Sequence, residues 1–211
     1  MTGTVSTASR DGRRERGDRS RGAILAKAVR LASEEGLDGL TFGRVGSEAH
    51  VAKSSIQVLF GSREKLQLAT LDEAMDIYRR IVVEPAMSRN SPLNCLTALL
   101  EGWYEFVRSR TLPGGCFLNA VSSEFRCRPG PVRERIQTYR KDKRTRFREL
   151  IGQAQQVNEL RSDLETDQLV FAWVACEAVA NVATLIGDED EFERARQVAL
   201  AHLRAATRSI P

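Results

Sequence analysis

The sequence has few of the residues from which metal sites and catalytic centres are built. Its 211 residues include two histidines and four cysteines, and no C-x-x-C spacing links the cysteines. The common zinc-ligand patterns are therefore excluded, and we expect neither a metal nor a cofactor. The sequence also offers no nucleophile-base-acid set and no phosphate-binding loop, so it does not favour an enzyme.

Long uncharged apolar runs are also missing. The longest apolar stretch, Leu169 to Ile186, contains Glu177 and Asn181 near its middle and is rich in alanine, which favours a buried helix over a membrane span. The N-terminus is polar and arginine-rich, unlike the apolar centre of a signal peptide. We therefore expect a cytoplasmic protein with free thiols and no membrane partner.

Strand-like alternation of apolar and polar residues has no useful length in this sequence, whereas apolar residues at helical spacing recur along it. The hydrophobic content of 42% is sufficient for a real core. We therefore predict an all-α protein, in which Pro85 ends the fourth helix. The expected helices span about Arg21–Glu35, a short segment after Thr41, Lys53–Phe60, Ser62–Val83, Pro92 to the turn at Leu112, Cys116–Phe125, Pro131–Gln155, Thr166–Ile186 and Asp190–Arg208.

The stretch from Thr41 to Leu66 reads as two short helices joined by a tight turn. Thr41 can cap the first helix, and Ala49-His50-Val51 forms the turn. The second helix turns Ile56 and Phe60 inward. Its outward residues have the small, polar or basic character of a helix that enters the major groove of DNA: Lys53, Ser54, Ser55, Gln57 and Val58.

A helix-turn-helix outline of this kind also occurs in helical hairpins that bind no DNA. The charge distribution favours the DNA interpretation, because residues 1–66 contain 12 basic and 8 acidic residues whereas residues 67–211 contain 20 of each. The net positive charge therefore belongs to the end of the chain that carries the helix pair. Counterion release from phosphates would contribute to affinity there.

A set of residues lies at fixed spacings within residues 20–70: Thr41, Phe42, Val45, Ala49, Val51, Lys53, Phe60, Ser62, Glu64 and Leu66. With the preceding amphipathic helix, this set resembles the N-terminal domain of the TetR/AcrR family of repressors. The resemblance implies a three-helix domain that binds a double-stranded DNA operator. The residues expected to read the DNA are Lys53, Ser54, Ser55 and Gln57, and those expected on phosphate are Thr41, Arg44 and Arg63.

Four positions depart from the usual pattern of that family. His50 stands in place of the glycine of the turn, where a positive φ is expected. Ala52 replaces the serine or threonine that caps the second helix, a loss of about 1 kcal/mol. Gln57 replaces a tyrosine that contacts phosphate in the family, and Arg63 replaces a lysine with its charge retained.

We expect three regions along the chain. Residues 1–20 form a disordered basic arm, residues 21–66 the helix-turn-helix DNA-binding domain, and residues 67–211 a helical ligand-binding and dimerisation domain. The arm either adds phosphate or minor-groove contacts or is a solvated tail of no specificity. In the resembling family, the helix that begins after Ser62 connects the phosphate contacts to the ligand chamber.

The phrase GGCFLNAVSSEF followed by RPGPVRERI resembles the C-terminal domain of a branch of TetR-like regulators. The resemblance implies a homodimer in which the last two helices form a four-helix bundle with their copies. The apolar character of the first of these two helices also favours such an interface. An internal chamber for a small-molecule effector is implied as well, and its candidate residues, which could equally be plain core, are Trp103, Phe106, Cys116, Phe117, Tyr139 and Trp173.

Two residues of this region have alternative interpretations. Lys143 falls on an apolar stripe, where it either snorkels to the edge of the face or meets an acidic ligand group or a buried carboxylate such as Glu177. We favour snorkelling. Cys116 follows a Gly-Gly turn near a helix start, where it is either a thiol sensor or, as we favour, a buried inert cysteine.

These observations favour a homodimeric, ligand-responsive transcriptional regulator, acting as a repressor, that a small apolar or amphipathic effector releases from a palindromic operator. The alternative is a helical small-molecule-binding or adaptor protein without a DNA function. An adaptor could use residues 126–148, which contain 10 basic and 2 acidic residues.

Overall fold

The computed structural model describes residues 8–208 of the chain, with side chains from residue 20 onward. Over these residues there is no strand, only an isolated bridge between Leu160 and Thr207. The all-α prediction is therefore confirmed. The chain divides into two compact units, Met1–Glu73 and Ala74–Pro211.

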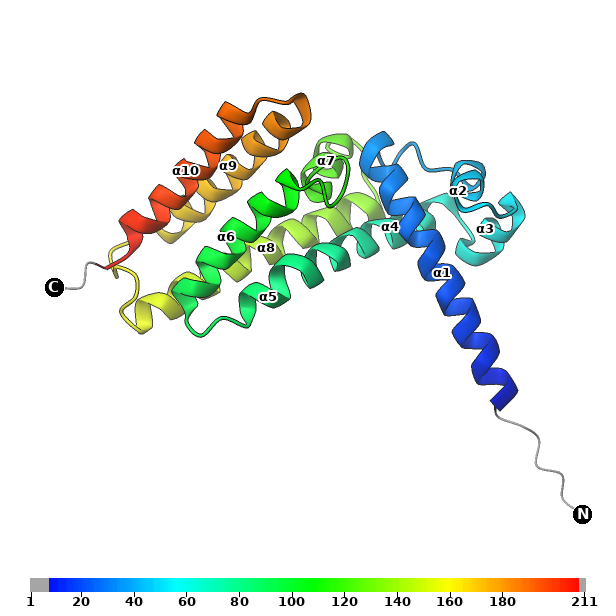
Figure 1. Cartoon of the computed structure of the whole chain (residues 1–211), viewed down its shortest axis with the longest axis horizontal. Coiled ribbons are helices and arrows are strands. Elements are labelled where there is room, and N and C mark those ends of the chain that lie inside the picture. Colours follow the sequence, from blue (N-terminus) through cyan, green and yellow to red (C-terminus); the bar gives the residue numbers. More distant parts are fainter. Residues whose placement is uncertain (1–7, 209–211) are drawn as a thin grey trace, which may run out of the picture. The chain divides into compact units, whose positions relative to one another are not determined.

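The first unit contains three helices and the start of a fourth, drawn from blue to cyan in Figure 1. Leu37 and Leu40, in the loop after the first helix, are completely buried. Gln67 donates from Nε2 to the carbonyl oxygen of Leu37 at 2.9 Å, so the fourth helix is still held to this unit beyond residue 66. The helices are α1 (Ala8–Glu35), α2 (Phe42–Ala49), α3 (Lys53–Phe60) and α4 (Arg63–Tyr78).

Helix α1 begins well before the predicted start at Arg21. Residues 1–7 of the expected disordered arm lie outside the described structure, whereas residues 8–20 are helical. The apolar face that starts at Ile24 and Leu25 is buried and supplies a nucleus for the helix. Extending a nucleated helix costs little per residue, and the stretch from residue 8 to residue 20 contains no proline.

We predicted that the helix following Ser62 ends at Pro85, but the helical segment continues past this residue. Helix α4 continues into a π-helix, η1 (Arg79–Val83), and then into α5 (Glu84–Met87). Pro85 lies in the first turn of α5, directly after the wider π turn. The backbone stays helical from Tyr78 through Glu84, so Pro85 lies within a continuous helical segment, and the π turn before it is the irregularity that accommodates a residue without an N–H. Gly102 of the next helix lets η1 approach closely, since a Cβ there would lie 3.1 Å from Val82 Cγ1.

The second unit is a helical bundle closed by an antiparallel hairpin of its last two helices (Figure 1). Gly187 joins the hairpin in the left-handed conformation, with φ 82°. Large buried side chains such as Trp103, Ile151 and Trp173 fill the core. The helices, whose bounds lie close to the predicted ones, are α6 (Pro92–Arg108), α7 (Phe117–Glu124), α8 (Pro131–Gln156), α9 (Thr166–Ile186) and α10 (Glu189–Ala206).

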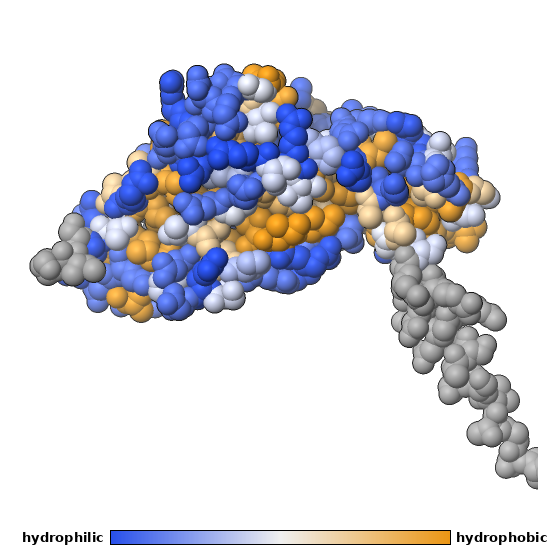
Figure 2. All heavy atoms as spheres, viewed as in Figure 1, coloured by the Kyte–Doolittle hydropathy of each residue, from blue (hydrophilic) through white to orange (hydrophobic). Residues whose placement is uncertain are grey.

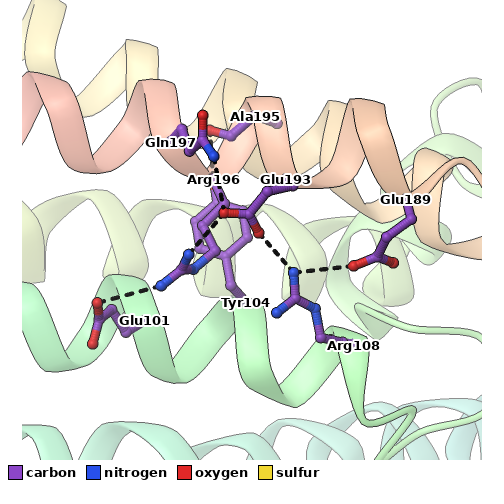
Figure 3. Close-up of polar contacts among 8 residues, drawn as sticks. All are labelled: Glu101, Tyr104, Arg108, Glu189, Glu193, Ala195, Arg196 and Gln197. Atoms are coloured by element: carbon purple, nitrogen blue, oxygen red, sulfur yellow. Dashed lines mark hydrogen bonds and ion pairs between the residues drawn. The ribbon is translucent and has the colours of Figure 1, made fainter.

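Polar contacts fasten α10 to α6, as Figure 3 shows. Arg108 donates to Glu193 at 2.7 Å, and the hydroxyl of Tyr104 donates to the carbonyl oxygen of Ala195 at 3.3 Å. Beneath the ion pair, the ring of Tyr104 packs edge-on against Phe192 at 5.7 Å. Because exposed ion pairs are weak, the buried aromatic contact carries most of this attachment. The surface over α10 in Figure 2 is mostly hydrophilic.

Candidate nucleic-acid interface and internal cavity

Helix α2 and its turn have the predicted local geometry. The Oγ1 of Thr41 accepts a hydrogen bond from the backbone N–H of Arg44 at 3.1 Å, which caps the helix. His50 ends α2 with φ 55° and ψ 40°, the left-handed conformation expected where the family has glycine. Its backbone N–H bonds back to the carbonyl oxygens of Gly46 and Ser47. The turn is therefore built without glycine at this position.

Gly46, which the sequence analysis missed, sets the distance between α2 and α3. A Cβ at this position would lie 2.8 Å from the carbonyl oxygen of Val51 and 3.6 Å from Cγ1 of Ile56. Backbone cannot move aside as a flexible side chain can, so only glycine allows this approach. A glycine inside a short helix is the signal that could have identified it.

Helix α3 has the predicted inward and outward residues. Ile56 and Phe60 are buried, and the guanidinium of Arg21 lies 5.2 Å from the centre of the Phe60 ring. Ala52 precedes the helix without a side-chain cap, as expected. Val58 is 87% exposed and adds a methyl-bearing side chain to the outer face. The other exposed residues of this face are Lys53, Ser54, Ser55 and Gln57.

The two arginines expected on phosphate have intramolecular partners. Arg44 donates from Nε to Glu35 at 3.2 Å and from Nη2 to the same carboxylate, and this hydrogen bonding lowers the pKa of Glu35. Arg63 donates from Nε to the carbonyl oxygen of Leu40 at 2.9 Å and from Nη2 to the carboxylate of Asp38 at 3.0 Å. Arg44 therefore links α2 to the end of α1, and Arg63 links α4 to the loop before α2. A phosphate would have to share them with these acceptors.

A cavity of about 240 Å³ lies within the second unit. Helices α6 and α8 and the start of α7 contribute to its walls. Five of the six residues expected in a chamber line it: Trp103, Phe106, Cys116, Phe117 and Tyr139.

Trp173, the sixth expected residue, is not among the cavity walls. It is completely buried in α9, where its Nε1 donates to the carbonyl oxygen of Ala199 at 3.1 Å. Its ring lies 5.3 Å from that of Phe147. Trp173 thus joins α9 to α8 and α10 as part of the core, because its polar atom is satisfied by a neighbouring helix.

The end of α4 and the π-helix line the cavity, as the resemblance implied for the helix after Ser62, although the sequence analysis named none of the residues involved. Met75, Tyr78, Arg79 and Val83 all line the cavity. Tyr78 lies four residues after Ala74 and packs edge-on against Phe106, with ring centres 5.5 Å apart. The spacing from Ala74 was a signal for Tyr78, because residues four apart share a helix face.

Lys143 forms the buried ion pair that was the alternative to snorkelling. Its side chain is 13% exposed, and its ammonium bonds to Oε2 of Glu177, which is 1% exposed. The snorkelling interpretation is therefore wrong. Burial raises the pKa of Glu177, although the neighbouring Lys143 opposes this. Removing one partner alone would leave a buried charge unpaired.

Two buried polar atoms beside this pair have no hydrogen-bond partner among the described residues. They are Nε1 of Trp103 and the second carboxylate oxygen, Oε1, of Glu177. The ammonium of Lys143 lies 5.5 Å from the centre of the Trp103 ring, so the three groups adjoin. Buried polar atoms are nearly always paired in native proteins, and such exceptions require an explanation.

Cys116 is buried at the start of α7 and lines the cavity. Its backbone N–H donates to Oδ1 of Asn181 at 2.6 Å. Gly115, with φ 73°, allows this contact, because a Cβ there would lie 2.5 Å from the same oxygen. Burial raises the pKa of the Cys116 thiol, so the thiol is neutral and the inert interpretation is the better supported one.

Helix α9 leaves an apolar face uncovered. Phe171 is 67% exposed, Val182 55% and Ile186 71%, while Glu177 and Asn181 on the other side are buried. By length and composition alone α9 could cross a membrane, but core helices of soluble proteins satisfy the same criteria. Apolar side chains exposed in one continuous row require a partner surface. The row comprises Phe171, Ala175, Ala178, Val179, Val182, Leu185 and Ile186.

Two family models match the sequence. One describes bacterial regulatory proteins of the tetR family and matches residues 24–70. The other describes a tetracyclin repressor-like C-terminal domain and matches residues 92–199, which is more than half of the chain. No curated protein matches the sequence.

Solved structures share this fold at low sequence identity. A TetR transcriptional regulator from Chloroflexus aurantiacus is 20% identical, with a TM-score of 0.85 over 93% of this chain and 100% of its own. A TetR-family regulator from Streptomyces coelicolor is 21% identical, with a TM-score of 0.76 over 90% and 97%. AibR, solved in complex with isovaleryl coenzyme A and operator DNA, is 17% identical, with a TM-score of 0.65 over 90% and 98%.

Proposed function

Because the chain belongs to the tetR family of bacterial regulatory proteins, we propose that it is a homodimeric, ligand-responsive repressor. It binds a palindromic operator and leaves it when a small apolar or amphipathic effector fills the cavity. The observation that carries this proposal is the outer face of α3, where four small, polar or basic residues are exposed beside a tightly packed α2. That face has the composition of a major-groove reader.

The residues of this interface have separate roles. Gln57 can form paired hydrogen bonds with a base edge, and Lys53, Ser54 and Ser55 complete the recognition surface. Thr41, Arg44 and Arg63 are assigned to phosphate, which positions the protein without reading sequence. For Arg63 the hydrogen bonds to Asp38 and Leu40 hold the guanidinium in place, and its Nη1 group is left for the phosphate.

The apolar row on α9 supports a homodimer. A second copy of the chain could cover Phe171, Val182 and Ile186 with the same residues of its own α9, as a two-fold axis requires. Two recognition helices on one dimer would then contact two half-sites of a palindrome. This arrangement gives the exposed apolar side chains a soluble partner, as expected for a cytoplasmic regulator.

Helix α4 offers a route for coupling the two functions. Arg63 stands at its first residue and Tyr78, a wall of the cavity, at its last. An effector that binds better to the α4 position of the DNA-free dimer would lower operator affinity by the same free energy. A difference of about 1–3 kcal/mol is sufficient for regulation. AibR, solved with both isovaleryl coenzyme A and operator DNA, indicates that this fold can accommodate a small molecule and an operator.

The test is a gel-shift titration of the purified protein against the DNA that flanks its own gene, with a random duplex as the control. We expect sequence-preferring binding that weakens as salt rises from about 50 to 200 mM. If the flanking DNA shows no preference, selection from a genomic fragment library extends the search to the remaining sites. A protein that selects no sequence by either route is not a repressor, and the small-molecule-binding or adaptor alternative replaces the proposal.

A further inference from the structure

Part of the cavity wall is formed by side chains that can donate hydrogen bonds. Lys143 and Trp103 both line it, and their charged and aromatic groups adjoin within 5.5 Å. Trp103 is completely buried, and its Nε1 lies beside the Cys116 thiol, a weak acceptor, but has no oxygen acceptor among the described residues. Tyr78 adds a hydroxyl to the same walls, and burial raises the pKa of that hydroxyl so that it remains a donor. A ligand that satisfies these groups must bring acceptor oxygens.

The charges around the cavity favour an anion over a neutral acceptor. Its walls carry three cations and two carboxylates. Arg79 is bound to Asp76 at 3.1 Å and also to Glu84, and Lys143 is bound to Glu177, so Arg146 is the wall cation without an ion-pair partner among the described residues. Glu177 neutralises Lys143 but is not itself a wall of the cavity. An incoming carboxylate would therefore compete with Glu177 for the ammonium of Lys143.

The rest of the cavity is apolar and small. Phe106, Phe117, Leu112 and Leu118 enclose it. A volume of about 240 Å³ corresponds to an apolar body of roughly eight non-hydrogen atoms, if each takes the ~30 Å³ that a water molecule occupies in the liquid. A chain of medium length or a single substituted ring is of that size.

We propose that the effector is a medium-chain or aryl-substituted monocarboxylic acid whose carboxylate binds Lys143 and Trp103 Nε1. This inference rests on the proposed function for its regulatory meaning, but the binding itself requires no DNA. Glu177 is then a competitor for the ammonium that tunes the affinity. The ligand carboxylate supplies the missing acceptor for Trp103, and the apolar body fills the space among the phenylalanines.

The experiment is calorimetric titration of the full chain, without DNA, with sodium octanoate and with octanamide. The two probes have the same length and differ in charge. We expect octanoate to bind at least about tenfold more tightly, because a hydrogen bond to a charged group contributes more than one between neutral groups. Equal binding of the acid and the amide, or no binding of either, would overturn the proposal.

Two variants are expected to change the affinity for octanoate in opposite directions. Glu177→Gln removes the competing carboxylate, so octanoate should bind roughly tenfold more tightly while octanamide is unchanged. Lys143→Met combined with Glu177→Gln removes both charges of the pair together and should reduce octanoate binding to the level of octanamide. Arg148→Gln is the control, since Arg148 is an exposed cation on α8 that does not line the cavity.

The outcomes separate this inference from the proposed function. If the protein binds the acid selectively but recognises no DNA, the ligand inference is supported and the repressor function is contradicted. If it binds an operator but does not prefer the acid, the repressor function is supported and the ligand inference is contradicted. If Glu177→Gln, which leaves Lys143 buried without its partner, does not fold, as circular dichroism would report, the double variant decides, and octanoate that still binds it more tightly than octanamide contradicts the proposal.

Discussion

Helices α3 and α9 each leave one face without a partner, but the two faces differ in kind. The outer face of α3 carries lysine, serines and glutamine around a single exposed valine, Val58. The outer face of α9 carries a row of apolar residues from Phe171 to Ile186. A polar face costs nothing in water and can exchange that water for phosphates and base edges, whereas an apolar row is stabilised only by burial. On this basis we propose that α3 binds DNA and that α9 binds a second copy of the chain.

The largest effect should come from charging the apolar row. Replacing Phe171 and Val182 by glutamate would bury charges at the proposed interface, so we expect the dissociation constant of the dimer to rise at least about 100-fold. Sedimentation velocity over a concentration series measures this. The matched control is Val157→Glu at the end of α8, where Val157 is 57% exposed but lies outside the row. If the double variant dimerises as tightly as the native protein, the apolar row on α9 is not the dimer interface.

Gly46→Ala tests the packing on which the α3 face depends. Its Cβ would meet the carbonyl oxygen of Val51 at 2.8 Å, so we expect a loss of about 1–3 kcal/mol in the free energy of unfolding. Gly43→Ala in the same helix is the control, because its Cβ would meet nothing closer than 4.0 Å. That variant should be stabilised by up to ~1 kcal/mol. Equal midpoints for both variants in urea would contradict the packing described for Gly46.

Gln57→Ala and Arg63→Ala separate base readout from phosphate contact on the α3 side. We expect Gln57→Ala to reduce discrimination between operator and random DNA by about 1–3 kcal/mol, and Arg63→Ala to weaken both duplexes alike. The Arg63 variant should also melt at a lower temperature, because Leu40 and Asp38 lose their hydrogen-bond donor. Binding isotherms by fluorescence anisotropy measure the first effect. A parallel loss on both duplexes in both variants would remove Gln57 from readout.

The smallest expected effect is a gain. Ala52→Ser would add the side-chain cap that α3 lacks, and we expect an increase of about 0.5–1 kcal/mol in stability. Thermal unfolding compared with the native protein measures it. Ala23→Ser, an exposed position inside α1, should give no such gain. A serine at residue 52 that stabilises no more than one at residue 23 would mean that α3 is held by packing alone.

Features with local causes could be predicted from the sequence. The left-handed His50 follows from its place in the tight turn, and the Ser91 cap followed by Pro92 gives the start of α6. The bounds of α9 follow from its apolar run and from Gly187. In each case residues within one turn of the chain determine the outcome, because caps and turns depend on neighbouring backbone groups.

Features with distant causes were missed or assigned wrongly. The partner of Lys143 is on another helix, so spacing alone left snorkelling as the simpler interpretation. The sequence does not show whether Trp173 lines the cavity or belongs to the core. Its hydrogen bond to the carbonyl oxygen of Ala199, on another helix, places it in the core. The π turn after Tyr78 and the hydrogen bonds of Arg63 to the loop before α2 likewise depend on contacts across the fold. Tertiary contacts of this kind leave no periodic pattern in the sequence from which they could be predicted.

The most direct test of the α3 and α9 assignments together uses the selected operator and a copy of it with five base pairs inserted between the half-sites. The insertion rotates one half-site by about half a helical turn relative to the other, while each half-site keeps its sequence. A dimer with two recognition helices should lose at least about tenfold in affinity for the lengthened operator, as measured by fluorescence anisotropy at one fixed salt concentration. Unchanged affinity would mean that each chain binds alone, and it would contradict a dimer formed through α9 that reads DNA with both copies of α3.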